Sequence, residues 1–424
     1  MAQPTLRRAV GRWQIVGLAM NDVIGSGIYL LPAAAAALLG PWSVGAVALA
    51  GFAVLLIVLC FAEAATHFDE PGSAYLYART AFGDLVGFQV GWMTWLTRVA
   101  SVASLAAGFA QALAFLWPGA NAGMGRTLTI ILSLVALYLV NVIGVRSGAR
   151  TAVVLAVGKV IPLLIFIAVG AFAFSTDRFL GQAVTQEGGL GAAALLLLYA
   201  YAGFENTAAA AGEFKNPQRD VPFALLTHIG LVTALYVLVQ LMVLGVLDHV
   251  GGSETPLADA SQLLLGSAGG LLLTVGAAVS IFGTNANTVF SGPRYLFALA
   301  RDGYFPAKLA EVHPRFRTPA VALTVQTLLA LPLALHGSFV HLATLSVVAR
   351  LVTYLGTTLA VPVLRRKMPP RPGAFRLPGG PTIPIVATGL GIVFATRATA
   401  ENLQAAGVAL LVGLVIYGIR GRRT

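Results

Sequence analysis

The stretch Asn21-Asp22-Val23-Ile24-Gly25-Ser26-Gly27-Ile28-Tyr29-Leu30-Leu31-Pro32 lies in the middle of a long apolar segment. Two glycines flank a serine, and a proline follows five residues later. Glycine lowers the cost of leaving helical geometry, and a serine hydroxyl can satisfy a freed backbone group. The stretch therefore predicts a helix that is interrupted halfway along its length.

The composition of the whole chain places this interrupted helix in a membrane. Of 424 residues, 58% are hydrophobic and 10% are charged, whereas soluble proteins carry about 25% charged residues. These values exclude a disordered chain, an ordinary nucleic-acid-binding protein and a cytosolic enzyme. They leave an all-α polytopic membrane protein, with the lipid bilayer as its surroundings.

Apolar segments long enough to span a bilayer recur along the chain. A spanning helix needs about 20 mostly apolar residues, and we predict twelve of them in a single transmembrane domain, residues 1–424. They lie near residues 13–38, 42–66, 84–117, 126–144, 149–175, 190–212, 223–247, 263–299, 320–336, 339–364, 383–397 and 403–420.

The basic residues predict the orientation of these helices. If both ends lie in the cytoplasm, 21 of the 27 basic residues fall on the cytoplasmic side and 3 on the outside. Such a bias is typical of the cytoplasmic loops of membrane proteins. The remaining three are Arg98, Lys159 and Arg350, inside the predicted spans. The basic character is therefore a signal of topology, and it requires no nucleic-acid partner.

A second interruption is predicted in the sixth span, at Tyr199-Ala200-Tyr201-Ala202-Gly203-Phe204-Glu205-Asn206. Either glycine alone could serve helix packing. The first and sixth spans, however, hold equivalent places in two five-helix halves, and paired interruptions of this kind indicate a transporter site. Free N–H groups at a half-helix N-terminus suit a carboxylate, and free carbonyls suit an ammonium. The pair of breaks therefore suits a zwitterion such as an amino acid.

Several ionisable side chains fall inside the predicted spans, where each costs at least a few kcal/mol. Lys159 lies about ten residues into its span, roughly 15 Å deep, so it needs a polar partner. Glu63 lies near the inner end of its helix, and we expect it to reach water. Arg98 and Arg350 are expected to hold helices together through carbonyls or an acid. Glu205 is the nearest acidic candidate, but the sequence does not assign the pairing.

Five motifs follow one another along the chain. They are Ile24-Gly25-Ser26-Gly27-Ile28-Tyr29, Gly158-Lys159-Val160-Ile161-Pro162, Gly203-Phe204-Glu205, the segment Glu213-Phe214-Lys215-Asn216-Pro217-Gln218-Arg219-Asp220-Val221-Pro222, and Arg301-Asp302-Gly303-Tyr304-Phe305-Pro306. Taken together, they resemble bacterial amino acid permeases of the amino acid–polyamine–organocation (APC) transporter superfamily. The resemblance extends over nearly the whole chain, although Glu70-Pro71-Gly72-Ser73-Ala74-Tyr75 departs from the family pattern.

This resemblance implies a LeuT-like five-plus-five inverted repeat with broken helices 1 and 6, in the inner membrane. The first repeat would cover about 13–175, the second about 190–364, and two additional helices about 383–420. Gly25, Ser26 and Gly27 would hold the substrate carboxylate. Carbonyls of Val23, Tyr199 and Ala202 would hold the substrate amine. The side chain of Tyr199 would close over the substrate from outside, and Gly203 would belong to the substrate site at the second break.

The resemblance also assigns coupling and conformational roles. The ammonium of Lys159 would stand where related transporters bind sodium, and it would contact backbone near Gly25. Hydroxyls of Ser280 and Thr284, four residues apart on one helix face, would join it, and Glu205 would lie beside the second break. The implied transporter is sodium-independent and needs neither metal nor cofactor. It would be a proton symporter, with protons as a partner, or an exchanger.

The sequence leaves the substrate and several alternatives open. Val102, Ala200 and Ala202 suggest a mostly apolar pocket, which favours neutral amino acids over a cationic amino acid or a polyamine. An intramembrane enzyme would need a nucleophile–base pair or metal ligands within the spans, but all six histidines fall at span ends or in loops. We therefore predict no catalytic residues. A channel would need a continuous polar stripe along its pore or a repeated filter segment, and the sequence shows neither. The sequence does not indicate an oligomeric state.

Overall fold

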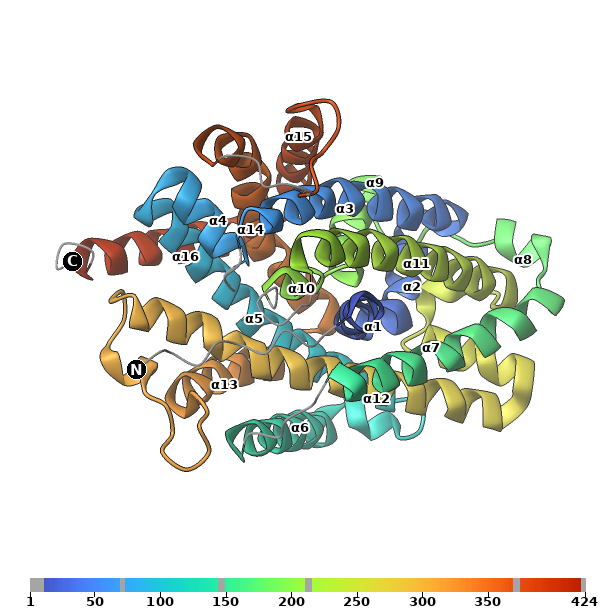
Figure 1. Ribbon diagram of the computed structural model, residues 1–424. Helices are drawn as coiled ribbons and strands as arrows, with labels where there is room; N and C mark the ends of the chain where they lie inside the picture. Colours follow the sequence, from blue (N-terminus) through green and yellow to red (C-terminus); the bar gives the residue numbers. More distant parts are fainter. Residues whose placement is uncertain (1–10, 69–72, 144–148, 210–215, 369–373, 421–424) are drawn as a thin grey trace.

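The computed structural model of the protein describes residues 11–68, 73–143, 149–209, 216–368 and 374–420. Those residues form helices and loops, and they contain no strand (Figure 1). The α-helices are α1 (Arg12–Val23), α2 (Ser26–Leu39), α3 (Ser43–Thr66), α4 (Ser73–Phe82), α5 (Asp84–Leu113), α6 (Gly123–Ile143), α7 (Ala149–Phe172), α8 (Thr176–Leu180), α9 (Gly189–Ala200), α10 (Glu205–Ala209), α11 (Pro217–Val246), α12 (Pro256–Arg301), α13 (Ala320–His336), α14 (Phe339–Lys367), α15 (Thr382–Thr396) and α16 (Ala400–Arg420). Short 3-10 helices are η1 (Gly40–Trp42), η2 (Pro118–Asn121), η4 (Val250–Gly252) and η5 (Ala307–Ala310).

Seven helical stretches of the described chain are long and apolar enough to cross a membrane. Three shorter apolar helices accompany them, including α13 and α15. This confirms the prediction of an all-α polytopic membrane protein. The seven stretches are Ser26–Thr66, Asp84–Leu113, Gly123–Ile143, Gln218–Val246, Pro256–Arg301, Phe339–Lys367 and Ala400–Arg420.

Some helix boundaries differ from those predicted. The eighth predicted span, 263–299, belongs to the 46-residue helix α12, which begins at Pro256 and kinks at Gly266. A proline in the first turn fixes the start of a helix, and the polar residues that follow it hide this turn from a search for apolar segments. Gly266 has φ 66°, a conformation that favours glycine. Helix α4 is a ten-residue helix outside all the predicted spans.

The outermost helices present apolar side chains to their surroundings. Leu132 on α6 is 65% exposed and Leu411 on α16 is 62% exposed, and neighbouring leucines and valines on the same helices are exposed as well. A soluble protein rarely exposes so large an apolar surface. These faces are suited to contact with lipid.

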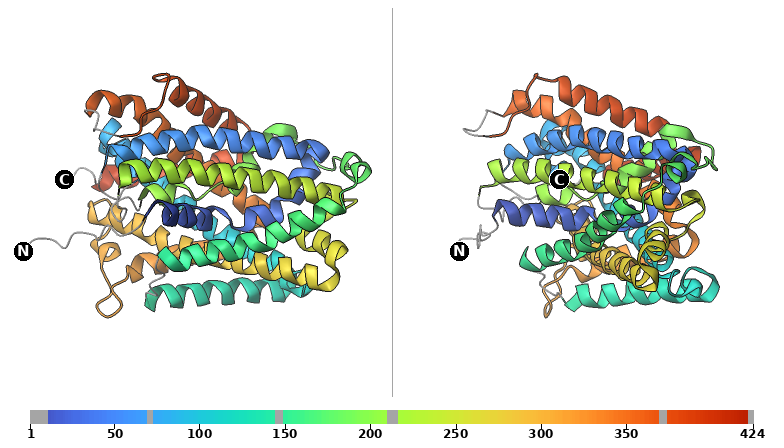
Figure 2. Two further views of the ribbon diagram at one scale, coloured as in Figure 1. Left: turned by 45° about the vertical axis from the view of Figure 1, so that its right-hand side comes forward. Right: turned by 90° about the vertical axis from the view of Figure 1, so that its right-hand side faces the viewer.

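The interrupted helices lie inside this shell. Helix α1 packs against α7 and α11, and α2 packs against α9 and α12. In Figure 1, α1 is seen nearly end-on near the centre, with α11 and α12 on opposite sides of it. Figure 2 shows that the start of α1 and the end of α16 lie toward the same end of the molecule.

Glu63 does not reach water as predicted. Its side chain is buried, and it accepts two hydrogen bonds from Arg365, at 2.6 and 2.7 Å. The backbone N–H of Leu377 donates a third, at 2.8 Å. The expectation failed because Arg365 lies 302 residues away in the sequence. The ion pair ties α3 to α14 and to the segment that leads into α15.

Candidate functional site

The first interruption separates α1 from α2 at Ile24 and Gly25. Gly25 has φ −127° and ψ −136°, outside helical geometry. Helix α2 therefore begins anew at Ser26, and its first backbone N–H groups lack intrahelical acceptors. The last carbonyls of α1 are likewise left without intrahelical donors.

Lys159, on α7, donates hydrogen bonds to carbonyls freed by this break. Its ammonium donates to the carbonyl oxygens of Asn21 at 2.9 Å and Ile24 at 3.1 Å, and to the hydroxyl of Thr284 at 3.0 Å. The side chain is 1% exposed. Ser280 contacts the same break rather than the lysine, since its hydroxyl donates to the Ile24 carbonyl at 2.9 Å. Three acceptors thus match the three N–H groups of an ammonium.

The second interruption, residues 201–204, separates α9 from α10 and lies against the first. Gly203 has φ +126°, and a β-carbon added there would lie 2.7 Å from the carbonyl oxygen of Asp22. Glycine is therefore required both by the conformation and by the close approach of the two breaks. The carboxylate of Glu205 accepts a hydrogen bond from the backbone N–H of Gly203 at 3.0 Å.

The carbonyls expected to face an amine are partly occupied by protein donors. Tyr236, on α11, lies with its hydroxyl 3.2 Å from the Val23 carbonyl and 3.0 Å from that of Ala200. The Tyr199 carbonyl accepts from the N–H of Ala202 at 3.1 Å. Each carbonyl oxygen keeps a second lone pair for a ligand. Tyr236 was missed in the sequence because a tyrosine in an apolar span gives no sign of its partner.

Glu205 also joins two arginines from other helices. Arg98 on α5 donates to Glu205 Oε1 at 3.2 Å and to Asn206 Oδ1 at 2.6 Å. Arg350 on α14 lies 2.9 Å from the same carboxylate oxygen and donates to Ser101 at 3.1 Å. All three charged side chains are at least 96% buried. Both arginines therefore contact the same acid, and through it they connect α5 and α14 to the start of α10.

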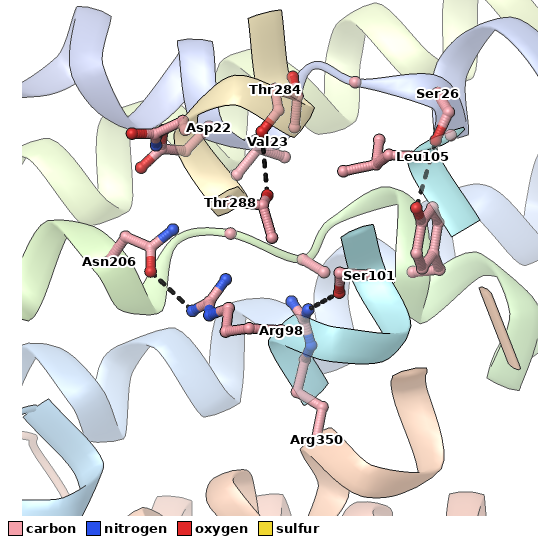
Figure 3. Close-up of a pocket in the computed structure, with 16 residues that line it drawn as sticks. Asp22, Val23, Ser26, Arg98, Ser101, Leu105, Asn206, Thr284, Thr288 and Arg350 are labelled. Carbon is pink, nitrogen blue, oxygen red and sulfur yellow. Dashed lines mark hydrogen bonds between the residues drawn. The ribbon is translucent and has the colours of Figure 1, made fainter. Parts of the chain in front are cut away.

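A pocket lies between the two interruptions and these arginines, and we call it the central pocket (Figure 3). Eight of the residues predicted to bind substrate or to couple transport line it: Val23, Gly25, Ser26, Gly27, Tyr199, Ala202, Gly203 and Thr284. Lys159, Ser280 and Glu205 lie behind its walls, where they hold the lining residues in place.

The prediction of a mostly apolar pocket is wrong. Val102 and Ala200 do not line the central pocket, although Ala202 does. Much of the wall is instead polar or charged: Asp22, Arg98, Ser101, Asn206, Asn287, Thr288 and Arg350. Asn287 could have been found, because it lies three residues after Thr284 and so shares its helix face. It contacts the carboxylate of Asp22.

Tyr199 lines the central pocket beside Ser26. Its hydroxyl lies 3.3 Å from that of Ser26, and its ring packs edge-on against Phe339 with centroids 5.8 Å apart. Gly27 lies against α9, because an added β-carbon would stand 2.7 Å from the α-carbon of Ala200. Glycine at this position lets the two half-helices α2 and α9 touch beside Tyr199.

Comparison with known proteins identifies the family of the chain. The amino acid permease family model matches residues 10–416. The serine/threonine exchanger SteT of Bacillus subtilis is 31% identical over 99% of this chain and 98% of its own length. The branched-chain amino acid permease BcaP and a methylthioribose transporter, both of Bacillus subtilis, are 29% and 27% identical, each over 99% of this chain and 94% of its own length. These relatives are transporters rather than enzymes, and the chain belongs to the amino acid permease family.

Proposed function

We propose that the protein is a sodium-independent amino acid exchanger that works by alternating access. The observation that carries this proposal is the contact between two helix interruptions across one pocket lined by both. Backbone outside regular helices at membrane depth is tolerated only where it is buried or lines a cavity. At such a place, free N–H and C=O groups of the protein backbone can bind the backbone of the substrate, so few polar side chains are needed.

The proposal includes the predicted architecture. The interruptions of α1–α2 and α9–α10 would be the broken helices 1 and 6 of a LeuT-like protein with twelve spans. Its repeats would cover about 13–175 and 190–364, and the two additional helices about 383–420. The common end of α1 and α16 would face the cytoplasm of a bacterial cell, as the basic residues favour. The oligomeric state is not part of this proposal.

The substrate backbone would lie between the two breaks. Its carboxylate would accept from the N–H groups of Ser26 and Gly27 at the start of α2, where the helix dipole adds attraction. Its ammonium would donate to carbonyls of Val23, Tyr199 and Ala202. Tyr199 would cover this end of the pocket and exclude water from it.

Lys159 would replace a bound sodium ion. Its ammonium bridges α7, the first break and α12 through the Asn21 and Ile24 carbonyls and the Thr284 hydroxyl. A fixed cation at this place fulfils the bridging role of a metal ion, so sodium would add nothing. Because all three N–H groups have acceptors, a permanently charged brace is favoured over a carrier that releases its proton during each cycle.

The charges of the central pocket argue against the cationic alternative. A cationic amino acid or a polyamine would place its charged side chain in a pocket lined by Arg98 and Arg350. Like charges so close together in a medium of low dielectric repel each other strongly. The sequence favoured a neutral substrate because an apolar pocket was expected. The polar pocket wall removes that reason.

Counterflow into proteoliposomes tests the proposal. Vesicles loaded with a mixture of unlabelled amino acids would accumulate a labelled amino acid from the outside, equally well in sodium and in choline buffers. Vesicles loaded with buffer alone would accumulate little. A steep, saturable dependence on sodium, or equal uptake into loaded and empty vesicles, would contradict the proposal.

A further inference from the structure

The charged groups around the central pocket do not balance. In their ordinary ionised forms, Asp22 and Glu205 supply two negative charges, whereas Lys159, Arg98 and Arg350 supply three positive charges. Asp22 contacts Asn287, and none of these five groups is exposed. A net charge is expensive to keep inside a membrane protein. One positive charge of this set is therefore left for a ligand to neutralise.

The excess lies at the two arginines. Both guanidinium groups share one oxygen of Glu205, and its other oxygen is taken by the N–H of Gly203. A carboxylate can match a guanidinium in a two-bond pair, but here one carboxylate serves two such groups. Glu205 therefore does not offer a separate carboxylate oxygen to each arginine.

Arg350 has unused hydrogen-bonding capacity. Among the described residues, its Nε has no hydrogen-bond partner, and the same is true of Nε of Arg98. Arg350 is 3% exposed, and leaving a buried N–H unpaired costs free energy. Both arginines line the central pocket, and Figure 3 shows the end of Arg98 beside Asn206 and the end of Arg350 beside Ser101, away from Ser26.

We propose that the central pocket takes an α-amino acid with a second carboxylate on its side chain. This inference rests on the proposed function. With its α-carboxylate at Ser26, the side chain of such a substrate would extend toward α5 and α14. Its terminal carboxylate would pair with Arg350, supported by Arg98 and by Asn206. The added negative charge brings the five charged groups and the ligand to balance, which a neutral or cationic substrate does not do.

Matched acid and amide ligands test this inference. L-Glutamate and L-glutamine have nearly the same shape, as do L-aspartate and L-asparagine, so each pair isolates the charge. Equilibrium binding to the purified full-length protein in detergent would give a dissociation constant for each ligand. We expect at least one acid to bind about tenfold more tightly than its amide, or better, since a hydrogen bond to a charged group is worth more than one to a neutral group.

Variants of Arg350 assign the preference to its guanidinium. Arg350→Gln should weaken binding of the acid about 10- to 100-fold, the range for a lost charged hydrogen bond, and weaken the amide less. Arg350→Lys keeps the charge but loses the planar fork, so it should retain part of the preference. Arg178→Gln removes a positive charge from an exposed ion pair with Asp248 outside the pocket, and it should leave the acid-to-amide ratio unchanged.

The outcomes separate this inference from the proposed function. Binding and counterflow of amides or other neutral amino acids without any acid would overturn the inference and leave the exchanger intact. An acid preference that persists unchanged in both Arg350 variants would overturn the assignment to Arg350. A protein that neither binds nor exchanges any α-amino acid would overturn the proposed function itself.

Discussion

Two groups of buried cations lie on opposite sides of the central pocket, and they are held in different ways. Lys159 donates to two backbone carbonyls and one hydroxyl, whereas Arg98 and Arg350 depend on the carboxylate of Glu205. Bringing an ion into a protein interior costs several kcal/mol unless it is paired and hydrogen-bonded. The comparison shows that a broken helix can itself supply the acceptors for a cation.

The difference has a mechanical consequence. Because Lys159 holds carbonyls of the first interruption, its contacts must change whenever α1 moves relative to α7. The arginines instead hold one side chain at the start of α10 and face the space that a ligand would fill. We therefore expect the lysine to control movement and the arginines to control stability and selectivity.

Removing the shared carboxylate should produce the largest effect. Glu205→Gln leaves two buried guanidinium groups without a counter-charge, and breaking a buried pair in this way costs about 3–5 kcal/mol. Thermal unfolding in detergent should show a strongly destabilised protein. Glu401→Gln, which changes an exposed glutamate at the start of α16, is the matched control. A Glu205→Gln protein as stable as the control would show that the arginines do not need their partner.

Removing the ammonium of Lys159 should impair movement more than folding. Lys159→Met keeps a long flexible side chain but loses three hydrogen bonds, and we expect transport to fall by about tenfold or more, as a loss above about 1.4 kcal/mol implies. Counterflow at fixed pH should fall accordingly, whereas uptake driven by a proton gradient into empty vesicles should be low in the unchanged protein and in the variant, because an exchanger needs an internal substrate.

The two assays distinguish the roles of the lysine. Strong gradient-driven uptake by the unchanged protein that Lys159→Met loses while it retains counterflow would instead identify Lys159 as a proton carrier. Lys308→Met, in the 3-10 helix η5, removes an exposed ammonium and should change neither assay. Full activity of Lys159→Met in both assays would contradict either role.

A β-carbon at the second interruption should have a moderate effect. Gly203→Ala must adopt φ +126° and place its methyl group against the Asp22 carbonyl, which costs about 1–3 kcal/mol for the backbone alone. Substrate affinity should fall as the two breaks move apart. Gly230→Ala, where an added β-carbon meets nothing within 4 Å, should bind substrate normally. Equal affinities in the two variants would show that the contact between the breaks does not shape the site.

The smallest effect is expected from the hydroxyl of Tyr199. Tyr199→Phe loses the hydroxyl that lies 3.3 Å from that of Ser26 but keeps the ring, so substrate affinity should fall by about two- to threefold, the low end for a hydrogen bond. Tyr199→Ala also loses the packing on Phe339 and should cost about tenfold. Titration of both variants with the transported amino acid would check this order, and equal losses would argue against a closing role for the ring.

Local features of the chain could be predicted from sequence, because their causes are local. Gly25 and Gly203 mark the interruptions through the conformational freedom of glycine, and the depth of Lys159 follows from its position along an apolar span. The start of α12 was missed because its first turns are polar.

Pairings across the fold could not be predicted. Arg98 and Glu205 are 107 residues apart, and Glu63 and Arg365 are 302 apart, so nothing in either local sequence indicates the partner. The same limitation explains why the sequence led to the wrong prediction of an apolar pocket. Ala202 does line the pocket, but Arg98, Ser101 and Arg350 reach it from helices that are distant in sequence.

We propose that the two interruptions together hold the backbone of an amino acid. The decisive experiment is a structure of the protein determined with its transported amino acid bound. The α-carboxylate should lie at the N–H groups of Ser26 and Gly27, and the ammonium at the carbonyls around Val23 and Ala202. A ligand bound elsewhere, or one that touches only one of the two interruptions, would contradict it.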